Sequence, residues 1–369
     1  MKRYFWRVSC LWILVAMPLA ASTTRIWALN INSDGTNSID IIDPVTNKIV
    51  QTIEGIPKPH DVAFSPDKSR AYVTSEDEQS ENALYVVDTK TGQILQKASL
   101  DGRRGNVPAI TKDGKRLLVC VGAPRNEKGF VPPESTAGAL DVVDTTSLKV
   151  LKTIPLRGHD CYTTPDGKYW IAGTGSFLSV IDVKTEERVW QVPYEEDLGP
   201  ISIETNPDGS TRRLFVTWHV TYPEFSVVDF ATHKEVARIK LPDKPSGFLV
   251  GPFGSLLTRR NVAPVHANVI SPDGKILAIA CRSANAVFLY SLPEIKLLGY
   301  ASTPTLEGQE HPSDGGDPVW LTYTPDSKTI YVANAAANVV SAIDVKAMKE
   351  VARIPVGKQP DHVETVVLP

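Results

Sequence analysis

The chain has 369 residues, with 39 Lys or Arg against 42 Asp or Glu, and a formal net charge of −3 at pH 7. A mildly acidic chain without a basic run argues against a nucleic acid as its main partner. Its four cysteines form no Cys-x-x-Cys-His sequence, which excludes covalently attached c-type haem.

The first 21 residues have the pattern of a secretory signal peptide. Basic residues at positions 2, 3 and 7 precede an apolar run from Val8 to Leu19, and small residues follow it. The run is too short to span a bilayer comfortably, so we expect cleavage and no stable membrane insertion. The mature chain, residues 22–369, is then predicted to be periplasmic or secreted. Its three widely spaced cysteines predict no disulfide framework.

Two short patterns recur along the mature chain. The first is a Pro-Asp turn, in which Pro at the second position and Gly at the fourth suit a type I turn. The second is an apolar strand that ends in Asp. The turns begin at Ser65, Thr111, Thr164, Asn206, Ser271 and Thr324, and the strands end at Asp43, Asp88, Asp144, Asp182, Asp229 and Asp344. Each unit therefore predicts four short antiparallel strands, which is the pattern of a propeller blade.

The two ends of the chain complement each other. Six complete units run from about His60 to Lys358, the segment 25–54 supplies three strands without a first one, and 361–369 supplies a single first strand. Pairing them would close a ring and remove the exposed edges that an open arrangement would leave. We therefore predict an all-β fold with one domain over residues 22–369. This domain is a seven-bladed β-propeller of four-stranded antiparallel blades, closed by the C-terminal strand.

The last repeat carries a family resemblance. The segment TPDSKTIYVANAAANVVSAIDVKAMKEVARIPVGKQPDHV, residues 324–363, resembles the repeat of the YVTN family of bacterial seven-bladed propellers. Its tetrad YVAN starts at Tyr331, and a second copy, YVTS, starts at Tyr72. The resemblance covers essentially the whole mature chain and implies the superfamily of cytochrome d1, nitrous-oxide reductase and lactonase-type propellers. It implies the fold rather than the function, because propellers carry many unrelated activities.

The long loops of the predicted blades all open on one face of the ring. They span residues 75–82, 122–138, 244–265 and 302–317, and the third is apolar enough to act as a lid. Long loops on a rigid scaffold commonly carry recognition, although they are also where insertions are tolerated. We expect any ligand site on this face.

Three histidines occupy the same position in the repeat. His60, His159 and His266 each lie seven residues before the Asp of the next Pro-Asp turn, at the start of a first strand. His362 lies on the closing strand, where aligning KPHDV with QPDHV places Asp361 opposite His60. Imidazoles that converge from separate strands suit Fe, Cu or Zn without a local motif. These four histidines are therefore the candidate metal ligands or catalytic groups.

The same positions have a structural interpretation. In WD-type propellers a Gly-His pair at this loop is a hydrogen-bonding latch, and Gly158-His159 resembles it. Further candidates lie on inner strands or on the looped face. Glu204 and Glu364 are candidate acid or base partners of the histidines, and His219, His311, Arg282 and Asp317 are candidate ligand-binding residues.

Three functions follow from this pattern. The first is a binding protein whose histidine-lined mouth takes a small ligand or a transition metal. The second is an enzyme, either lactonase- or lyase-like or a histidine-metal oxygenase. The third is a scaffold, expected to be monomeric, that docks a redox or envelope partner in the periplasm. The Gly-x-Ser-x-Gly, His-Glu-x-x-His and P-loop patterns are missing, which disfavours the commonest hydrolase and nucleotide chemistries.

Overall fold

The structure is a computed structural model of the chain. It describes residues 23–32, 35–77, 80, 82–100, 104–122, 138–156, 158–173, 176–195, 198–218, 223–242, 264–305 and 315–369. The predicted signal peptide, nearly all of the predicted lid, His219 and His311 lie outside the described residues. Within the described ranges all regular secondary structure is β-strand. No helix in these ranges is long and apolar enough to cross a membrane.

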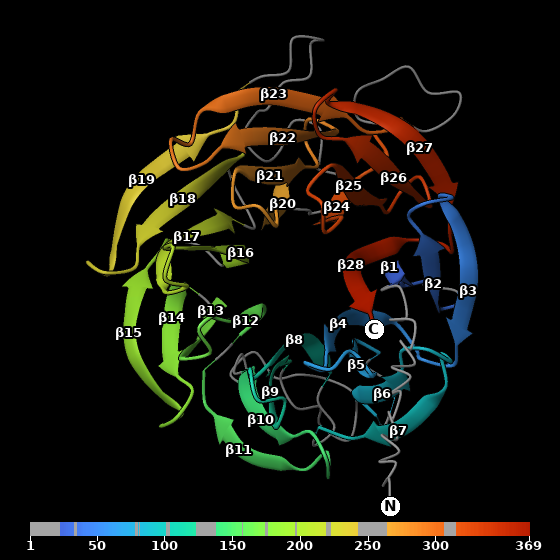
Figure 1. Cartoon of the computed structure of the whole chain (residues 1–369). Helices are drawn as coiled ribbons and strands as arrows, with labels where there is room; N and C mark the ends of the chain where they lie inside the picture. Colours follow the sequence, from blue (N-terminus) through green and yellow to red (C-terminus); the bar gives the residue numbers. More distant parts are fainter. Residues whose placement is uncertain are drawn as a thin grey trace, which may run out of the picture.

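Seven four-stranded antiparallel sheets stand around a ring (Figure 1). Blade one consists of β4 (Pro59–Phe64), β5 (Arg70–Ser75), β6 (Leu84–Asp88) and β7 (Ile94–Ala98). Blade two consists of β8 (Gly105–Ile110), β9 (Arg116–Val121), β10 (Ala139–Asp144) and β11 (Val150–Ile154). Blade three consists of β12 (Cys161–Thr163), β13 (Tyr169–Gly173), β14 (Phe177–Asp182) and β15 (Glu187–Pro193). The lowest-numbered strand of each of these blades is the innermost one, as the repeat predicts.

Blades four to six repeat this order, and blade seven combines both ends of the chain. Blade four consists of β16 (Leu198–Thr205), β17 (Thr211–Trp218), β18 (Glu224–Asp229) and β19 (Lys234–Lys240), and blade five of β20 (Val265–Ile270), β21 (Ile276–Cys281), β22 (Ala286–Ser291) and β23 (Leu297–Ser302). Blade six consists of β24 (Pro318–Tyr323), β25 (Thr329–Asn334), β26 (Val339–Asp344) and β27 (Lys349–Pro355). Blade seven consists of β28 (Pro360–Leu368), β1 (Thr23–Asn30), β2 (Ser38–Asp43) and β3 (Lys48–Glu54).

The C-terminal strand closes the ring. Strand β28 pairs antiparallel with β1 from Thr23↔Leu368 to Leu29↔His362, and it takes the innermost place of blade seven. The predicted closure is therefore confirmed. Pairing the first described strand with the last one satisfies two rows of backbone groups that an open ring would leave as edges.

The hydrophobic core lies between neighbouring blades. The middle strands are apolar runs buried on both faces, as in β21, where five of six residues are buried. Aromatic side chains such as Trp170, Phe215 and Phe288 fill the spaces between sheets and are fully buried. Because each blade buries both of its faces against its neighbours, the strands read as near-continuous Val, Ile and Leu runs that match the β-propensity of these residues.

Each outer strand carries a β-bulge. The register against the neighbouring strand slips by one residue in all seven blades, as between Ile41↔Gln51 and Ile42↔Ile49. The extra residue is apolar and 45–61% exposed every time: Val50, Leu95, Leu151, Val189, Val236, Leu298 and Val351. Bulges bend and twist an edge strand, so the ring presents no flat edge for pairing with another sheet.

The Pro-Asp turns join the first and second strands of their blades, at the end opposite to the start of the first strand. In the first of them Ser65 Oγ donates to Asp67 Oδ1 at 2.6 Å, and this hydrogen bond lowers the pKa of Asp67. Thr164 and Asp166 repeat the contact at 2.6 Å. The carboxylate holds the turn together through local hydrogen bonds, which is why the repeat keeps Asp at this position.

Candidate functional site

A second set of bulges lies where the inner strands begin, at the channel mouth. In blade one, Pro59 pairs with Ser75 and Val62 with Val73, so His60 and Asp61 together lie opposite Thr74 alone. Blade five has the same slip around His266, and the closing strand has it around Asp361. A bulge redirects the side chains that it contains. The repeat therefore delivers polar side chains from separate blades to one end of the channel.

Three histidines and one aspartate meet at this mouth. The ring of His60 lies 4.4 Å from that of His362 and 6.1 Å from that of His159, measured between centroids. Asp361 lies between the strands, with its Oδ2 at 2.8 Å from His362 Nδ1 and 3.9 Å from His60 Nε2. His60 and His362 are buried, at 4% and 1% exposure, whereas the side chain of His159 is 44% exposed. We call His60, His159, Asp361 and His362 the mouth cluster.

His266, the fourth predicted ligand, is linked to the mouth cluster by ring contacts through the side chain of Trp320. Its ring lies 5.7 Å from that of Trp320, which in turn lies 3.9 Å from the ring of His362. Its Nδ1 is 3.0 Å from the backbone carbonyl of Val319. The structure thus brings together three of the four predicted histidines, adds Asp361, and gives His266 a backbone partner.

The pKa values of the mouth cluster diverge. Burial lowers the pKa of His60 to about 4. Burial also opposes the charge on His362, but the carboxylates of Asp61 and Asp361 outweigh it and raise the pKa of His362 to about 9. Asp361 is stabilised in return: despite its desolvation, the hydrogen bond and charge of His362 hold its pKa well below the usual range. At neutral pH the imidazole of His60 is therefore neutral and that of His362 is cationic.

The mouth cluster has a donor set that suits a transition metal. His60, Asp361 and His362 each offer one ligand atom, and these atoms lie within 4.8 Å of one another. Two imidazoles and a carboxylate suit non-haem iron, zinc or copper. In the described part of the chain, His362 Nε2 and His60 Nδ1 are buried without a hydrogen-bond partner. Such atoms are costly unless a ligand engages them, so the residues fit a metal ion.

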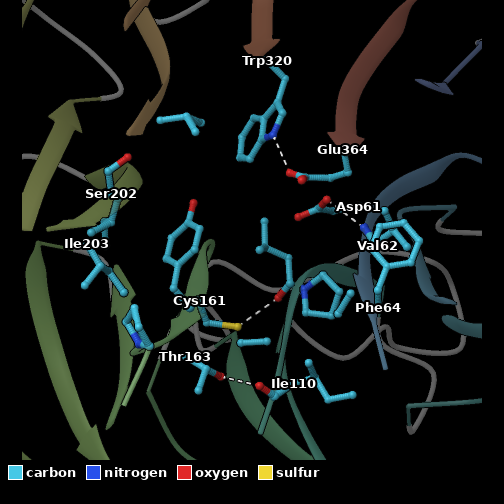
Figure 2. A pocket seen from close by; sticks show the side chains of 18 of the residues that line it. Asp61, Val62, Phe64, Ile110, Cys161, Thr163, Ser202, Ile203, Trp320 and Glu364 are labelled. Atoms are coloured by element: carbon cyan, nitrogen blue, oxygen red, sulfur yellow. Dashed lines mark hydrogen bonds between the residues drawn. The ribbon is translucent and has the colours of Figure 1, made fainter. Parts of the chain in front are cut away.

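A channel continues inward from the mouth along the axis. It has a volume of about 480 Å³, and the inner strands of all seven blades contribute to its wall (Figure 2). Asp61 and Glu364 point toward one another there, and Trp320 Nε1 donates to Glu364 Oε1 at 3.1 Å. Desolvation raises the pKa of Asp61 to about 6. Desolvation and the carboxylate of Asp61 raise the pKa of Glu364 to about 8.

The other predicted site residues have partners away from the histidines. Glu204 forms a two-point ion pair with Arg213, at 2.5 Å to Nε and 3.0 Å to Nη2, near the turn that follows β16. Arg282 forms a similar pair with Asp317, at 2.6 and 2.8 Å, across blades five and six. These groups neutralise one another, so in this structure they link strands and blades.

Sequence reasoning did not select Asp361 or Trp320 as site residues. The signal for Asp361 was the alignment that places it opposite His60, which the bulge of β28 now explains. Trp320 lies in an apolar strand and reads as core, yet its Nε1 holds Glu364. Glu76 was also unselected, and its Oε1 lies 3.5 Å from His60 Nε2.

No protein-family model matches the sequence, and the search of curated proteins finds no relative. Solved structures do resemble it. A periplasmic gluconolactonase of Pseudomonas aeruginosa, PpgL, matches with a TM-score of 0.69 at 16% identity, over 94% of this chain and 100% of that chain. Hydrazine synthase of Kuenenia stuttgartiensis matches with a TM-score of 0.59 at 19% identity, over 84% and 90% of the two chains.

The dihydro-haem d1 dehydrogenase NirN, solved in complex with DHE, matches with a TM-score of 0.58 at 16% identity, over 89% of this chain and 63% of that chain. The chain is therefore a seven-bladed β-propeller, similar to a broad group of bacterial propeller proteins. The mouth cluster and the acidic channel behind it are features of this chain's own structure. At these identities the likeness shows the fold alone.

Proposed function

We propose that this chain is an exported propeller of the YVTN type that binds a transition metal ion at its mouth cluster. The observation that carries the proposal is the convergence of His60, Asp361 and His362, whose ligand atoms lie within 4.8 Å of one another. They come from β4 and β28, which are adjacent in space and at opposite ends of the sequence. The apolar N-terminal segment with its basic start supports export.

The chemistry of the donors favours zinc, iron or copper over magnesium or calcium. Imidazole nitrogens suit the former, whereas the latter take mainly oxygen ligands. Asp361 would serve as the anionic ligand, and Glu76, 3.5 Å from His60 Nε2, is placed to orient that imidazole. His159 is more exposed and stands at the outer side of the mouth cluster, where it can approach an ion from the solvent.

The test is a zinc titration of the mature chain after removal of bound metal with EDTA. We expect equimolar binding, weakened by at least about tenfold in His60→Ala and in His362→Ala. His233→Ala is the matched control, because His233 is exposed, stacks on Trp190 at 4.5 Å and lies in a turn of the opposite face. This control should bind zinc like the wild type.

Two further variants refine the assignment. Asp361→Asn should weaken zinc binding as the histidine variants do, whereas His266→Ala should have a smaller effect because its Nδ1 engages a backbone carbonyl. Circular dichroism of each variant reports on the fold. If folded His60→Ala and His362→Ala proteins bind zinc as tightly as the wild type, the proposal is wrong.

A further inference from the structure

The channel behind the mouth has the character of an organic ligand site. Its volume of about 480 Å³ falls in the range of small-molecule pockets, which are mostly apolar with a few polar groups. Phe64, Tyr162 and Trp320 contribute aromatic surface from three different blades, and aliphatic side chains of other inner strands complete the wall. A bare metal ion would use neither this volume nor these walls.

The charge in the channel is one-sided. Asp61 and Glu364 are its ionisable carboxyl groups, and the described lining residues include no Lys, Arg or His. The buried carboxylate of Glu204, in contrast, has Arg213 as its partner. Asp61 accepts the backbone N–H of Val62 at 2.7 Å, and its charge partner is the imidazolium of His362 at the mouth. This imidazolium is shared by Asp61 and Glu364. A single cation beside two buried carboxyl groups leaves one carboxylate charge uncompensated, which is costly.

Asn268 brings a further acceptor to the wall of the channel. Asn268 lines the channel and is 3% exposed, and its Oδ1 is buried without a hydrogen-bond partner in the described part of the chain. Its Nδ2 is already engaged, donating to the carbonyl of Pro200 at 2.7 Å. The two carboxyl groups and this amide oxygen are acceptors, and a ligand that satisfies them must be a donor.

The blade structure does not require a glutamate at the position of Glu364. Glu364 pairs with Trp27 in blade seven at the register where Ala63 pairs with Tyr72 in blade one and Ala109 with Leu118 in blade two. The same register holds Tyr162, Ser202, Val269 and Thr322 in blades three to six, so none of the six other blades has a carboxylate there. The carboxylate of Glu364, held by Trp320, is thus an addition to the fold that needs another explanation.

From these observations we infer that the channel binds a small organic ammonium ion, whose cationic head lies between Asp61 and Glu364 and whose hydrocarbon part lies against the aromatic wall. An ammonium group offers three donors and no acceptor, which complements two carboxylates and the Asn268 carbonyl oxygen. This site is separate from the metal ligands of the mouth cluster. It goes beyond the metal-binding proposal and does not depend on it.

The test uses n-pentylammonium as the probe and 1-pentanol as its neutral counterpart, both titrated calorimetrically into the mature wild-type chain. We expect the ammonium to bind at least about tenfold more tightly than the alcohol, since buried charge-assisted hydrogen bonds distinguish the two. Asp61→Asn and Glu364→Gln, which keep shape and remove charge, should each weaken ammonium binding at least tenfold. Glu187→Gln is the control, because Glu187 is exposed on the outer strand β15.

Several results would overturn the inference. Equal binding of ammonium and alcohol to the wild type would show a purely apolar channel, and this comparison needs no variant to fold. Unchanged ammonium affinity in folded Glu364→Gln and Asp61→Asn proteins would place the probe elsewhere. Displacement of the probe by magnesium or calcium at equal concentration would make the site an inorganic cation site. Zinc binding is measured separately, so either proposal can fail while the other stands.

Discussion

We expect the ion pair between Glu204 and Arg213 to act as a structural element of blade four rather than as an acid or base of the mouth. The side chains are 7% and 14% exposed, and the guanidinium contacts both carboxylate oxygens, at 2.5 and 3.0 Å. Arg213 Nη2 also donates to the carbonyl of Pro293 in blade five, at 2.9 Å. The perturbation is Arg213→Met, which keeps the length of the side chain and removes its charge.

The expected loss of folding free energy follows from the buried charge of Glu204, which the substitution leaves without its main partner. Removing one partner of a buried ion pair destabilises a protein by about 3–5 kcal/mol, because the other charge remains buried. Arg212 lies 3.5 Å from Glu204 and is 43% exposed, so a solvent-screened cation remains nearby. We therefore expect the lower end of this range, about 3 kcal/mol. Zinc binding at the mouth should be unchanged.

The assay is urea unfolding followed by circular dichroism, for the wild type, Arg213→Met and the double variant Glu204→Leu/Arg213→Met. The double variant should be more stable than the single one, because it removes both charges. A cost below about 1 kcal/mol for Arg213→Met, or a double variant that loses more than the single one, would refute this reasoning.

Two other predictions concern the mouth and the ring. Zinc affinity should rise about tenfold per pH unit between roughly pH 7 and 9, because zinc needs neutral imidazole and the pKa of His362 is raised to about 9; a flat profile in a chelator competition assay would contradict this. Deleting residues 360–369 removes β28 and leaves β1 without its inner partner. We expect a chain that is rapidly cleaved by trypsin and binds no zinc, and wild-type resistance to proteolysis would show that closure is dispensable.

The repeat made the fold predictable, because each blade carries its own turn, apolar strand and terminal Asp. The complementary ends made the closure predictable for the same reason. The shared entrance position of His60, His159 and His266 was also visible in the repeat, and aligning the closing strand placed Asp361 opposite His60. These features are local or periodic, so a single sequence contains them.

The remaining features depend on side-chain placement between blades. The bulge of β28 brings both Asp361 and His362 to the mouth, whereas a regular strand would turn neighbouring residues to opposite faces. The role of Trp320 depends on its reaching Glu364 from a neighbouring blade. Glu204 has its partner nine residues away across a hairpin, so its spacing alone suited both an acid catalyst and a structural ion pair.

The place of β28 in the ring has a consequence for biogenesis. Translation proceeds from the N-terminus, so His60 and His159 are made well before Asp361 and His362. A chain in which β28 has not yet docked holds half of the mouth cluster and gains the other half when this strand pairs with β1. Metal loading at the mouth would thus report that the ring has closed.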